Sequence, residues 1–292
     1  MPMPRPSADP GAPSGPARQP RIPARALELF CRLAAETGGL SVTPDREDFL
    51  LARLGPEVAR LGLSDFAAYA ELLGQRPTAD VLRGFSEALA THTTSFFREE
   101  AQYDWLRTEG IELLAARRLP GPLRIWSAAC SSGQELYSAL MTAADAMADG
   151  PLNGRLEGIG TDISTRILSR ARGAIYSGEE IGGIPLAMRR RWLLSDREGR
   201  PRHRISGELR GVCRWGQINL AEPSSLVGIR ADLAMLRNVL IYFDRPTRDR
   251  VVGAVVERLT AGGVLMTGHS EAIRPESFGL STLRPSIYRK ER

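Results

Sequence analysis

The segment Leu123-Arg124-Ile125-Trp126-Ser127-Ala128-Ala129-Cys130-Ser131-Ser132-Gly133-Gln134-Glu135 decides the fold of this 292-residue chain. A short apolar stretch comes first, then a run of small residues. Glu135 to Ala148 follows, with Leu136, Leu140 and Met147 on one side of a predicted helix. The order is therefore strand, tight loop, helix. Small loop residues let the backbone approach a ligand closely, and the helix N-terminus adds a positive end.

Strands and helices continue to alternate beyond this segment. Apolar stretches predict strands, and amphipathic stretches between them predict helices. Because such alternation favours parallel pairing, we expect an α/β fold with a doubly wound sheet and helices on both faces. Further strands are expected at Leu156–Gly160, Gly211–Trp215, Ala231–Met235, Val264–Met266 and Ser286–Tyr288, and helices at Ser164–Arg172 and Arg245–Leu259.

The rest of the chain divides by composition. Residues 1–23 hold eight of the 20 prolines and predict a disordered tail, because they cannot bury enough apolar surface to offset their ordering. Residues 24–90 repeat apolar side chains every three to four positions, which predicts a small bundle of about four helices. Residues 91–120 would form a linker and a first helix before the α/β domain at 121–292. Residues 176–210 fit no tight strand–helix unit, so we expect an insert at about 195–212, with Arg202 to Arg210 as a small hairpin.

Composition excludes several classes of protein. The net charge of +5 is mild, so a nucleic-acid partner is not expected. No apolar run reaches the roughly 18–20 residues of a membrane span, and the N-terminus lacks the apolar core of a secretory signal. The three cysteines lie far apart, which argues against disulfides and a cysteine metal site. We therefore expect a cytoplasmic protein without a metal or membrane insertion.

The ends of the first two strands predict the ligand. The loop after the first strand is neither a GxGxxG nor a Walker motif, which argues against a phosphate site. Asp162 follows the second strand, where an acidic residue commonly binds the ribose hydroxyls of a nucleoside. An adenosine ligand without a pyrophosphate fits both features, so S-adenosylmethionine suits them better than NAD. Asp162 could equally cap the helix that begins near Ser164.

Three further motifs resemble one known family. They are Thr94-Ser95-Phe96-Phe97-Arg98-Glu99, Leu236-Arg237-Asn238-Val239-Leu240-Ile241-Tyr242-Phe243-Asp244 and Gly268-His269-Ser270-Glu271. Their order and spacing resemble the CheR-type chemotaxis receptor (protein-glutamate) O-methyltransferases over about residues 25–290. The resemblance implies a class I methyltransferase domain with a small β-subdomain insert, preceded by an all-α N-terminal domain.

The resemblance also implies a set of site residues. Arg98 and Tyr242 would touch the reaction, with Arg98 gripping either the substrate carboxylate or the carboxylate of S-adenosylmethionine. Asp162 would hold the ribose. The expected cofactor-binding residues are His92, Thr94, Arg98, Glu135, Asp162, Asn219, Leu220, Arg237 and Asn238. The implied reaction converts glutamates in the cytoplasmic helical bundle of chemoreceptors to methyl esters and releases S-adenosylhomocysteine.

The sequence departs from the family pattern at three places. His92 stands where the family usually has Asn, and Gln134 replaces the first acid of a Glu-Glu pair whose second member is Glu135. Arg46, Arg53 and Arg60 recur every seven residues, as a basic docking helix requires, but Gly55-Pro56 is expected to interrupt that helix.

Other functions therefore stay open. The chain could be a degenerate relative that binds S-adenosylmethionine or S-adenosylhomocysteine as a sensor or scaffold. It could also methylate a protein outside chemotaxis. An RNA methyltransferase is disfavoured, because the chain lacks a strong basic stripe. The corresponding strand end also reads Arg237-Asn238-Val239-Leu240 rather than the Asn/Asp-Pro-Pro-Tyr/Phe motif used on amino groups.

Overall fold

The computed structural model describes residues 21–117, 120–147, 155–195 and 201–291. Residues 1–20 of the predicted tail lie outside the described residues. Residues 21–23, which were also expected to belong to the tail, are ordered, so the folded part does not begin at residue 24 as expected. Ile22 is buried, and its N–H donates to the Glu47 carboxylate at 2.7 Å, so the folded part begins before the first helix.

The N-terminal region is a helical bundle. Its α-helices among the described residues are α1 (Ala24–Gly38), α2 (Glu47–Arg60), α3 (Phe66–Gly74) and α4 (Ala79–Leu89), with a 3-10 turn at Pro44–Arg46. Asp65 and Thr78 cap α3 and α4 through their side chains. The core is aromatic and aliphatic, and Phe30, Tyr69 and Phe85 pack ring against ring in its centre.

Helix α2 runs through Gly55-Pro56 without a break, so the expected interruption was wrong. Proline removes one backbone hydrogen bond and crowds the preceding turn. Leu50 and Leu54 lie before it and Val58 after it, and all three are buried in the core of the bundle. Burial of this face on both sides of Pro56 holds the helix together across it.

The α/β region carries a seven-stranded sheet in the described part of the chain. Its strands are β1 (Leu123–Ser127), β2 (Leu156–Asp162), β6 (Cys213–Gln217), β7 (Ala231–Leu236), β8 (Leu259–Thr267), β9 (Leu280–Arg284) and β10 (Ile287–Lys290), in the spatial order β6-β2-β1-β7-β8-β10-β9. The strands from β6 to β8 are parallel, as predicted. β10 is antiparallel to both of its neighbours, and β9 was not expected.

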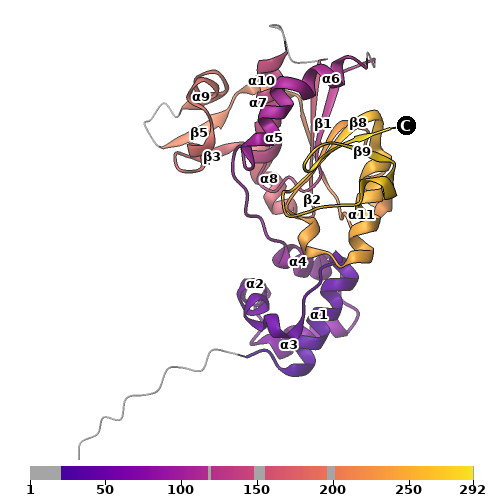
Figure 1. Cartoon of the computed structure of the whole chain (residues 1–292). Coiled ribbons are helices and arrows are strands. Elements are labelled where there is room, and N and C mark those ends of the chain that lie inside the picture. The colour runs from indigo at the N-terminus through magenta and orange to yellow at the C-terminus, as the bar shows by residue number, and fades with distance from the viewer. Residues whose placement is uncertain (1–20, 118–119, 148–154, 196–200, 292) are drawn as a thin grey trace, which may run out of the picture.

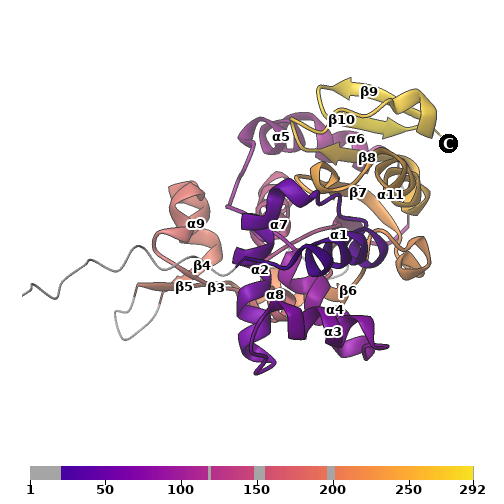
Figure 2. The ribbon, with the colours of Figure 1, turned by 90° about the horizontal axis from the view of Figure 1, so that it is seen from below.

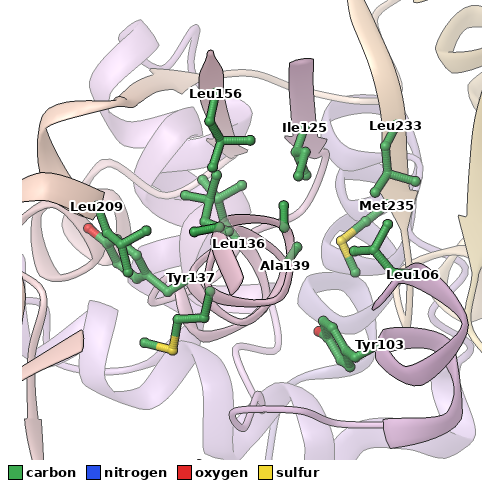
Figure 3. Close-up of a cluster of buried hydrophobic side chains, with 14 of the residues drawn as sticks. Tyr103, Leu106, Ile125, Leu136, Tyr137, Ala139, Leu156, Leu209, Leu233 and Met235 are labelled. Atoms are coloured by element: carbon green, nitrogen blue, oxygen red, sulfur yellow. The ribbon is translucent and has the colours of Figure 1, made fainter. Parts of the chain in front are cut away.

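Helices cover both faces of this sheet (Figures 1 and 2). One face packs against α7 (Gln134–Ala146) and a continuous helical segment made of α5 (Glu100–Trp105), a π-helical turn (Leu106–Gly110) and α6 (Ile111–Ala115). In Figure 3, Leu136 of α7 and Leu106 of the π-helical turn pack toward Ile125, Leu233 and Met235, which belong to strands of the sheet. The other face packs against α11 (Arg245–Arg258), and α8 (Thr165–Gly173) lies along β2 and β6.

A second, smaller sheet stands at one side of the main domain (Figure 1). It consists of β3 (Ile175–Ser177), β5 (Arg202–Ile205) and β4 (Leu193–Ser195), with α9 (Leu186–Trp192) and α10 (Gly207–Gly211) beside it. The hairpin predicted at Arg202 to Arg210 was wrong. Ser206 instead caps α10 by accepting from Leu209 N, and Leu209 is buried, so this half of the segment is helical.

The small sheet also begins earlier than the insert predicted at about 195–212, since β3 starts at Ile175. It is fixed to the main domain by its buried Trp192, whose indole N–H donates to Asp145 of α7 at 3.0 Å. Short 3-10 turns at Glu180–Gly183, Pro223–Leu226, Leu240–Tyr242 and Pro275–Phe278 complete the described elements.

Candidate functional site

A pocket opens where the strand order of the main sheet reverses, between β1 and β7. Ligands of open α/β sheets bind at the carboxyl ends of the strands at this point. The space measures about 970 Å³ including its open mouth. All ten predicted site residues line it: His92, Thr94, Arg98, Glu135, Asp162, Asn219, Leu220, Arg237, Asn238 and Tyr242. The structure thus brings together residues that are up to 150 positions apart in the sequence.

The helical bundle forms one wall of the pocket, which the sequence did not predict. In Figure 1 the bundle lies across the end of the sheet. Leu40, Ser86 and Leu89 from this N-terminal region line the cavity. Leu40 forms a β-bridge with Phe243, and Ser41 N donates to Tyr242 O at 2.8 Å. The backbone at Tyr242 is therefore tied directly to the bundle.

Asp162 ends β2 as a buried carboxylate. Its two oxygens accept from Ser131 N at 2.8 Å and from Ser164 N at 3.1 Å. The helix cap is Ser164, whose hydroxyl accepts from Ile167 N, so the alternative role of Asp162 as the α8 cap does not hold. Burial raises the pKa of Asp162, while neighbouring His92 and the backbone N–H donors act in the opposite direction.

His92 lies beside Asp162. Its Nδ1 is 3.9 Å from an Asp162 oxygen, and its Nε2 is buried without a hydrogen-bond partner among the described residues. Burial lowers the pKa of His92, so the imidazole is neutral at pH 7. Its carbonyl accepts from Ser131 Oγ at 3.0 Å, which anchors the segment before the Thr94–Arg98 motif to the loop after β1.

Arg237, at the end of β7, is the centre of a buried charge network. Its side chain is fully buried and pairs with Glu135 at 2.9 Å and with Glu99 at 3.1 Å. It also donates to Tyr103 Oη at 3.2 Å and to the carbonyl of Arg98. Burial would lower the pKa of Arg237, but the two carboxylates outweigh it and raise the pKa. The guanidinium is therefore permanently charged.

The two carboxylates of this network differ in environment. Burial raises the pKa of Glu135 even though Arg237 and Ser127 stabilise its ionised form. Burial opposes ionisation of Glu99 as well, but Arg237 and hydrogen bonds from Asn238 and His269 leave its pKa below the ordinary value. Glu99 belongs to the motif Thr94–Glu99 but had no predicted role, and its contacts with Arg237 and Asn238 span 138 and 139 positions of sequence.

The chain around Arg98 is tightly held. Phe97 and Glu99, on either side, both have positive φ angles (55° and 63°), and Phe97 N donates to Ser138 Oγ of α7 at 3.0 Å. The half-buried Arg98 guanidinium donates to Thr93 O at 3.1 Å and lines the pocket. Phe97 packs edge-on against Tyr103, and this core contact helps to fix the segment.

Two of the remaining predicted residues hold neighbouring protein groups. The Asn219 amide donates to Thr37 O of α1 at 2.7 Å and accepts from Ala221 N at 3.1 Å. Asn219 thus joins the sheet to the bundle, while Leu220 lies buried beside it. Gln134 does not line the pocket: its amide reaches toward Glu180 at 3.5 Å, so its departure from the family pattern faces the small sheet.

The pocket wall carries charges of both signs. The carboxylates of Glu135 and Asp162 and the guanidinium groups of Arg98 and Arg237 line it, and Arg237 pairs with Glu135 at 2.9 Å. S-adenosylmethionine also carries both signs, through its sulfonium, amino and carboxylate groups. The orphaned Nε2 of His92 and the buried Asp162 oxygens can also serve ribose hydroxyls. Fold and pocket together define a class I S-adenosylmethionine-dependent methyltransferase.

Comparison with known proteins identifies the family. Residues 92–286 match the family described as "CheR methyltransferase, SAM binding domain". The chain is 33% identical to a chemotaxis protein methyltransferase of Salmonella typhimurium, over 83% of this chain and 82% of the relative. It is 32% identical to chemotaxis protein methyltransferase 2 of Pseudomonas aeruginosa, over 86% and 87%. The chain therefore belongs to the CheR methyltransferase family.

Among the described residues, no group of three or more His, Cys, Asp or Glu side chains is arranged to hold a metal ion. No described helix combines the length and the apolar character that a membrane crossing requires.

Proposed function

We propose that this enzyme transfers the methyl group of S-adenosylmethionine to glutamate side chains of chemoreceptors, in the cytoplasm. Membership of the CheR family and relatives named chemotaxis protein methyltransferases support this substrate. The observation that carries the proposal is the composition of one pocket. Asp162 lies at the end of β2, and Arg98 and Tyr242 line the same cavity.

The bound cofactor would be held by residues from both domains. Asp162 and His92 would receive the ribose, and Leu220 would lie against the adenine, with Asn219 holding that segment in place. Glu135 would face the amino group of the methionine part. Thr94, Arg237 and Asn238 would complete the wall. Bound in this way, S-adenosylmethionine supplies an electrophilic methyl group on sulfur.

The reaction does not require proton transfer to activate the nucleophile. A glutamate carboxylate is ionised at pH 7 and needs no general base. One of its oxygens would take the methyl group that the bound S-adenosylmethionine supplies, with the carbon–sulfur bond of the cofactor broken as the carbon–oxygen bond forms, and S-adenosylhomocysteine would be released. The protein must therefore strip water from the carboxylate and align it. Arg98 would orient the carboxylate through paired hydrogen bonds, and Tyr242 would lie beside the methyl group.

A basic face on α2 suits an acidic receptor bundle. Arg46 and Arg53 both stack on the ring of Phe49. Arg60 lies seven residues after Arg53, and its side chain is more than half exposed. A polar groove adjoins the cofactor pocket at His92; arginines line it (Arg53, Arg60, Arg83 and Arg166) together with the acidic residues Glu57, Asp80 and Glu87. The continuity of α2 through Pro56 keeps Arg53 and Arg60 on one helix, and Arg46 is the N-cap residue of that helix. We propose this face as the docking surface for the receptor.

The test is transfer of a labelled methyl group to a chemoreceptor cytoplasmic fragment. We expect base-labile incorporation that releases methanol, as methyl esters do, and that disappears when the acceptor glutamates are changed to glutamine. Tyr242→Phe should lower the rate with little change in cofactor affinity. Cofactor binding without transfer to any fragment would contradict the proposal and favour a sensor or scaffold. Base-stable label would point to a different acceptor group.

Replacing His92 by Asn should leave cofactor affinity unchanged or tighten it. The substitution removes a buried ring nitrogen that lacks a protein partner and keeps a side chain that can donate one hydrogen bond. Titration calorimetry of His92→Asn with S-adenosylhomocysteine measures the effect. A loss of more than tenfold, about 1.4 kcal/mol, would show that the imidazole makes a contact with the ligand that the Asn amide cannot replace.

Cofactor affinity should fall in mild acid, at a higher pH than an exposed aspartate would cause. Because burial raises the pKa of Asp162, its carboxylate takes up a proton above the ordinary range near 4 and then loses acceptor strength. Burial lowers the pKa of His92, so its imidazole also takes up a proton in mild acid, and variants are needed to tell the two groups apart. Affinity for S-adenosylhomocysteine measured from pH 8 down to pH 4 should show the decrease, and Asp162→Asn should flatten it. A decrease that persists in Asp162→Asn and vanishes in His92→Asn would contradict this assignment.

A further inference from the structure

Glu271 is a buried carboxylate outside the pocket wall. It follows β8 in the Gly268–Glu271 turn and is 1% exposed. One of its oxygens accepts from Asn238 N at 2.6 Å and from Gly268 N at 2.9 Å, and the other accepts from Ile241 N at 3.3 Å. Its own N–H donates to Gly268 O at 2.9 Å. Glu271 therefore bridges the turn after β8 and the loop after β7.

The loop that Glu271 holds has an uncommon conformation. Asn238 has a φ of 56°, in the left-handed region that few side chains other than Asn, Asp and Gly adopt readily. Its amide also donates to Glu99 at 3.2 Å. The chain then enters the 3-10 turn Leu240–Tyr242. Glu271 thus contacts the loop at its second residue and just before Tyr242.

The packing around this contact leaves no room for adjustment. A Cβ added at Gly268 would lie 2.6 Å from a Glu271 oxygen and 2.8 Å from Asn238 Nδ2. The site therefore requires glycine at 268 for the carboxylate to reach both backbone donors. Hydrogen bonds to an ionised acceptor are stronger than those between neutral groups, so the carboxylate holds the loop firmly.

We infer that Glu271 is a positioning residue for methyl transfer: it fixes the Arg237–Tyr242 loop so that Tyr242 faces the pocket. It acts through the backbone of Asn238 and Ile241 and does not itself touch the cofactor cavity. This role rests on the proposed function of Tyr242 in the reaction.

The first test follows the backbone and needs no acceptor protein. Hydrogen exchange of the backbone amides of Asn238 and Ile241 should be at least tenfold faster in Glu271→Gln than in wild type. The reason is that the NH2 group of the Gln side chain is a donor and would face one of the backbone N–H groups in place of an acceptor oxygen. Glu276→Gln, an exposed glutamate in the next turn, is the charge-matched control and should leave exchange unchanged. Unchanged exchange in Glu271→Gln would overturn the inference.

The second test is a double-mutant cycle with Tyr242→Phe, measured as methyl transfer to the receptor fragment. Glu271→Gln should lower kcat about tenfold or more while changing the Kd of S-adenosylhomocysteine less than threefold. In the Tyr242→Phe background the same change should cost little further activity. Glu271→Asp, which keeps the charge, should recover part of the rate.

Equal losses in both backgrounds, or a kcat loss matched by the loss of cofactor affinity, would overturn the positioning role. If wild type transfers no methyl group to the fragment, the proposed function fails, whereas the exchange measurement still decides whether Glu271 holds the loop.

Discussion

Replacing Arg237 by methionine is expected to destabilise the enzyme by about 3–5 kcal/mol, the range found when one member of a buried ion pair is removed. Glu135 and Glu99 would both lose their cation, and Glu135 is already buried in an environment that disfavours its ionised form. For a protein of this size the melting temperature should fall by roughly 10 °C. Cofactor affinity should drop at least tenfold, because both carboxylates and the Arg98 backbone are held by the same guanidinium.

Arg237→Lys is the matched control. It keeps the charge but cannot bridge two carboxylates with a planar fork, so it should be intermediate in both measurements. Calorimetric melting and cofactor titration on the three proteins decide the outcome. If the melting temperature of Arg237→Met lies within about 2 °C of that of the wild type, the ion-pair network around Arg237 does not stabilise the fold.

Asp232→Ala should be destabilising to a similar extent, about 3–5 kcal/mol, while sparing the cofactor. Asp232 lies at the other end of β7 from Arg237. Its carboxylate accepts from Arg117 at 2.8 Å, from Arg124 N at 2.9 Å and from Thr260 Oγ1 at 2.8 Å. Arg117 and Asp232 are both less than a tenth exposed, so the substitution leaves a buried guanidinium without its counter-ion.

The measurements are urea unfolding and titration with S-adenosylhomocysteine below the melting temperature. Affinity should stay within threefold of wild type, since the pocket lies at the opposite end of the strand. Asp232→Asn, which retains an acceptor oxygen, should recover part of the stability. A tenfold loss of affinity in folded Asp232→Ala would mean that the two ends of β7 are coupled, against this expectation.

The sequence predicted the parallel part of the fold because that part is encoded locally. Apolar strands such as Leu123–Ser127, small-residue loops and amphipathic helices each carry their own periodicity. The antiparallel direction of β10 was not predictable in this way, because strand direction depends on the chain between β8 and β10. The continuity of α2 was not predictable either, because it depends on burial of Leu54 and Val58 against other helices of the bundle. The sequence Gly55-Pro56 alone predicts a break in the helix.

Asp162 was found from its place after the second strand and the other site residues through a resemblance of motifs, but the contacts of these residues were not predicted. Arg237 was expected to bind the cofactor, and in the structure it is also the buried centre of an ion-pair network with Glu135 and Glu99. Glu99 and Glu271 belong to the family motifs, but no role was predicted for either of them. Their shared partner, Asn238, is 139 and 33 positions away in the sequence. Only folding brings these pairs together. The same holds for Leu40 in the wall contributed by the bundle.

The most direct test of the central claim is isothermal titration of the intact chain with S-adenosylmethionine and S-adenosylhomocysteine, with Asp162→Ala as the control. Asp162 is the buried carboxylate at the end of β2, on which the proposed ribose site depends. We predict micromolar binding of both ligands by the wild type and its loss in the folded control. Absence of binding by the intact, folded wild type, or equal affinity in Asp162→Ala, would contradict the assignment of this pocket as the cofactor site.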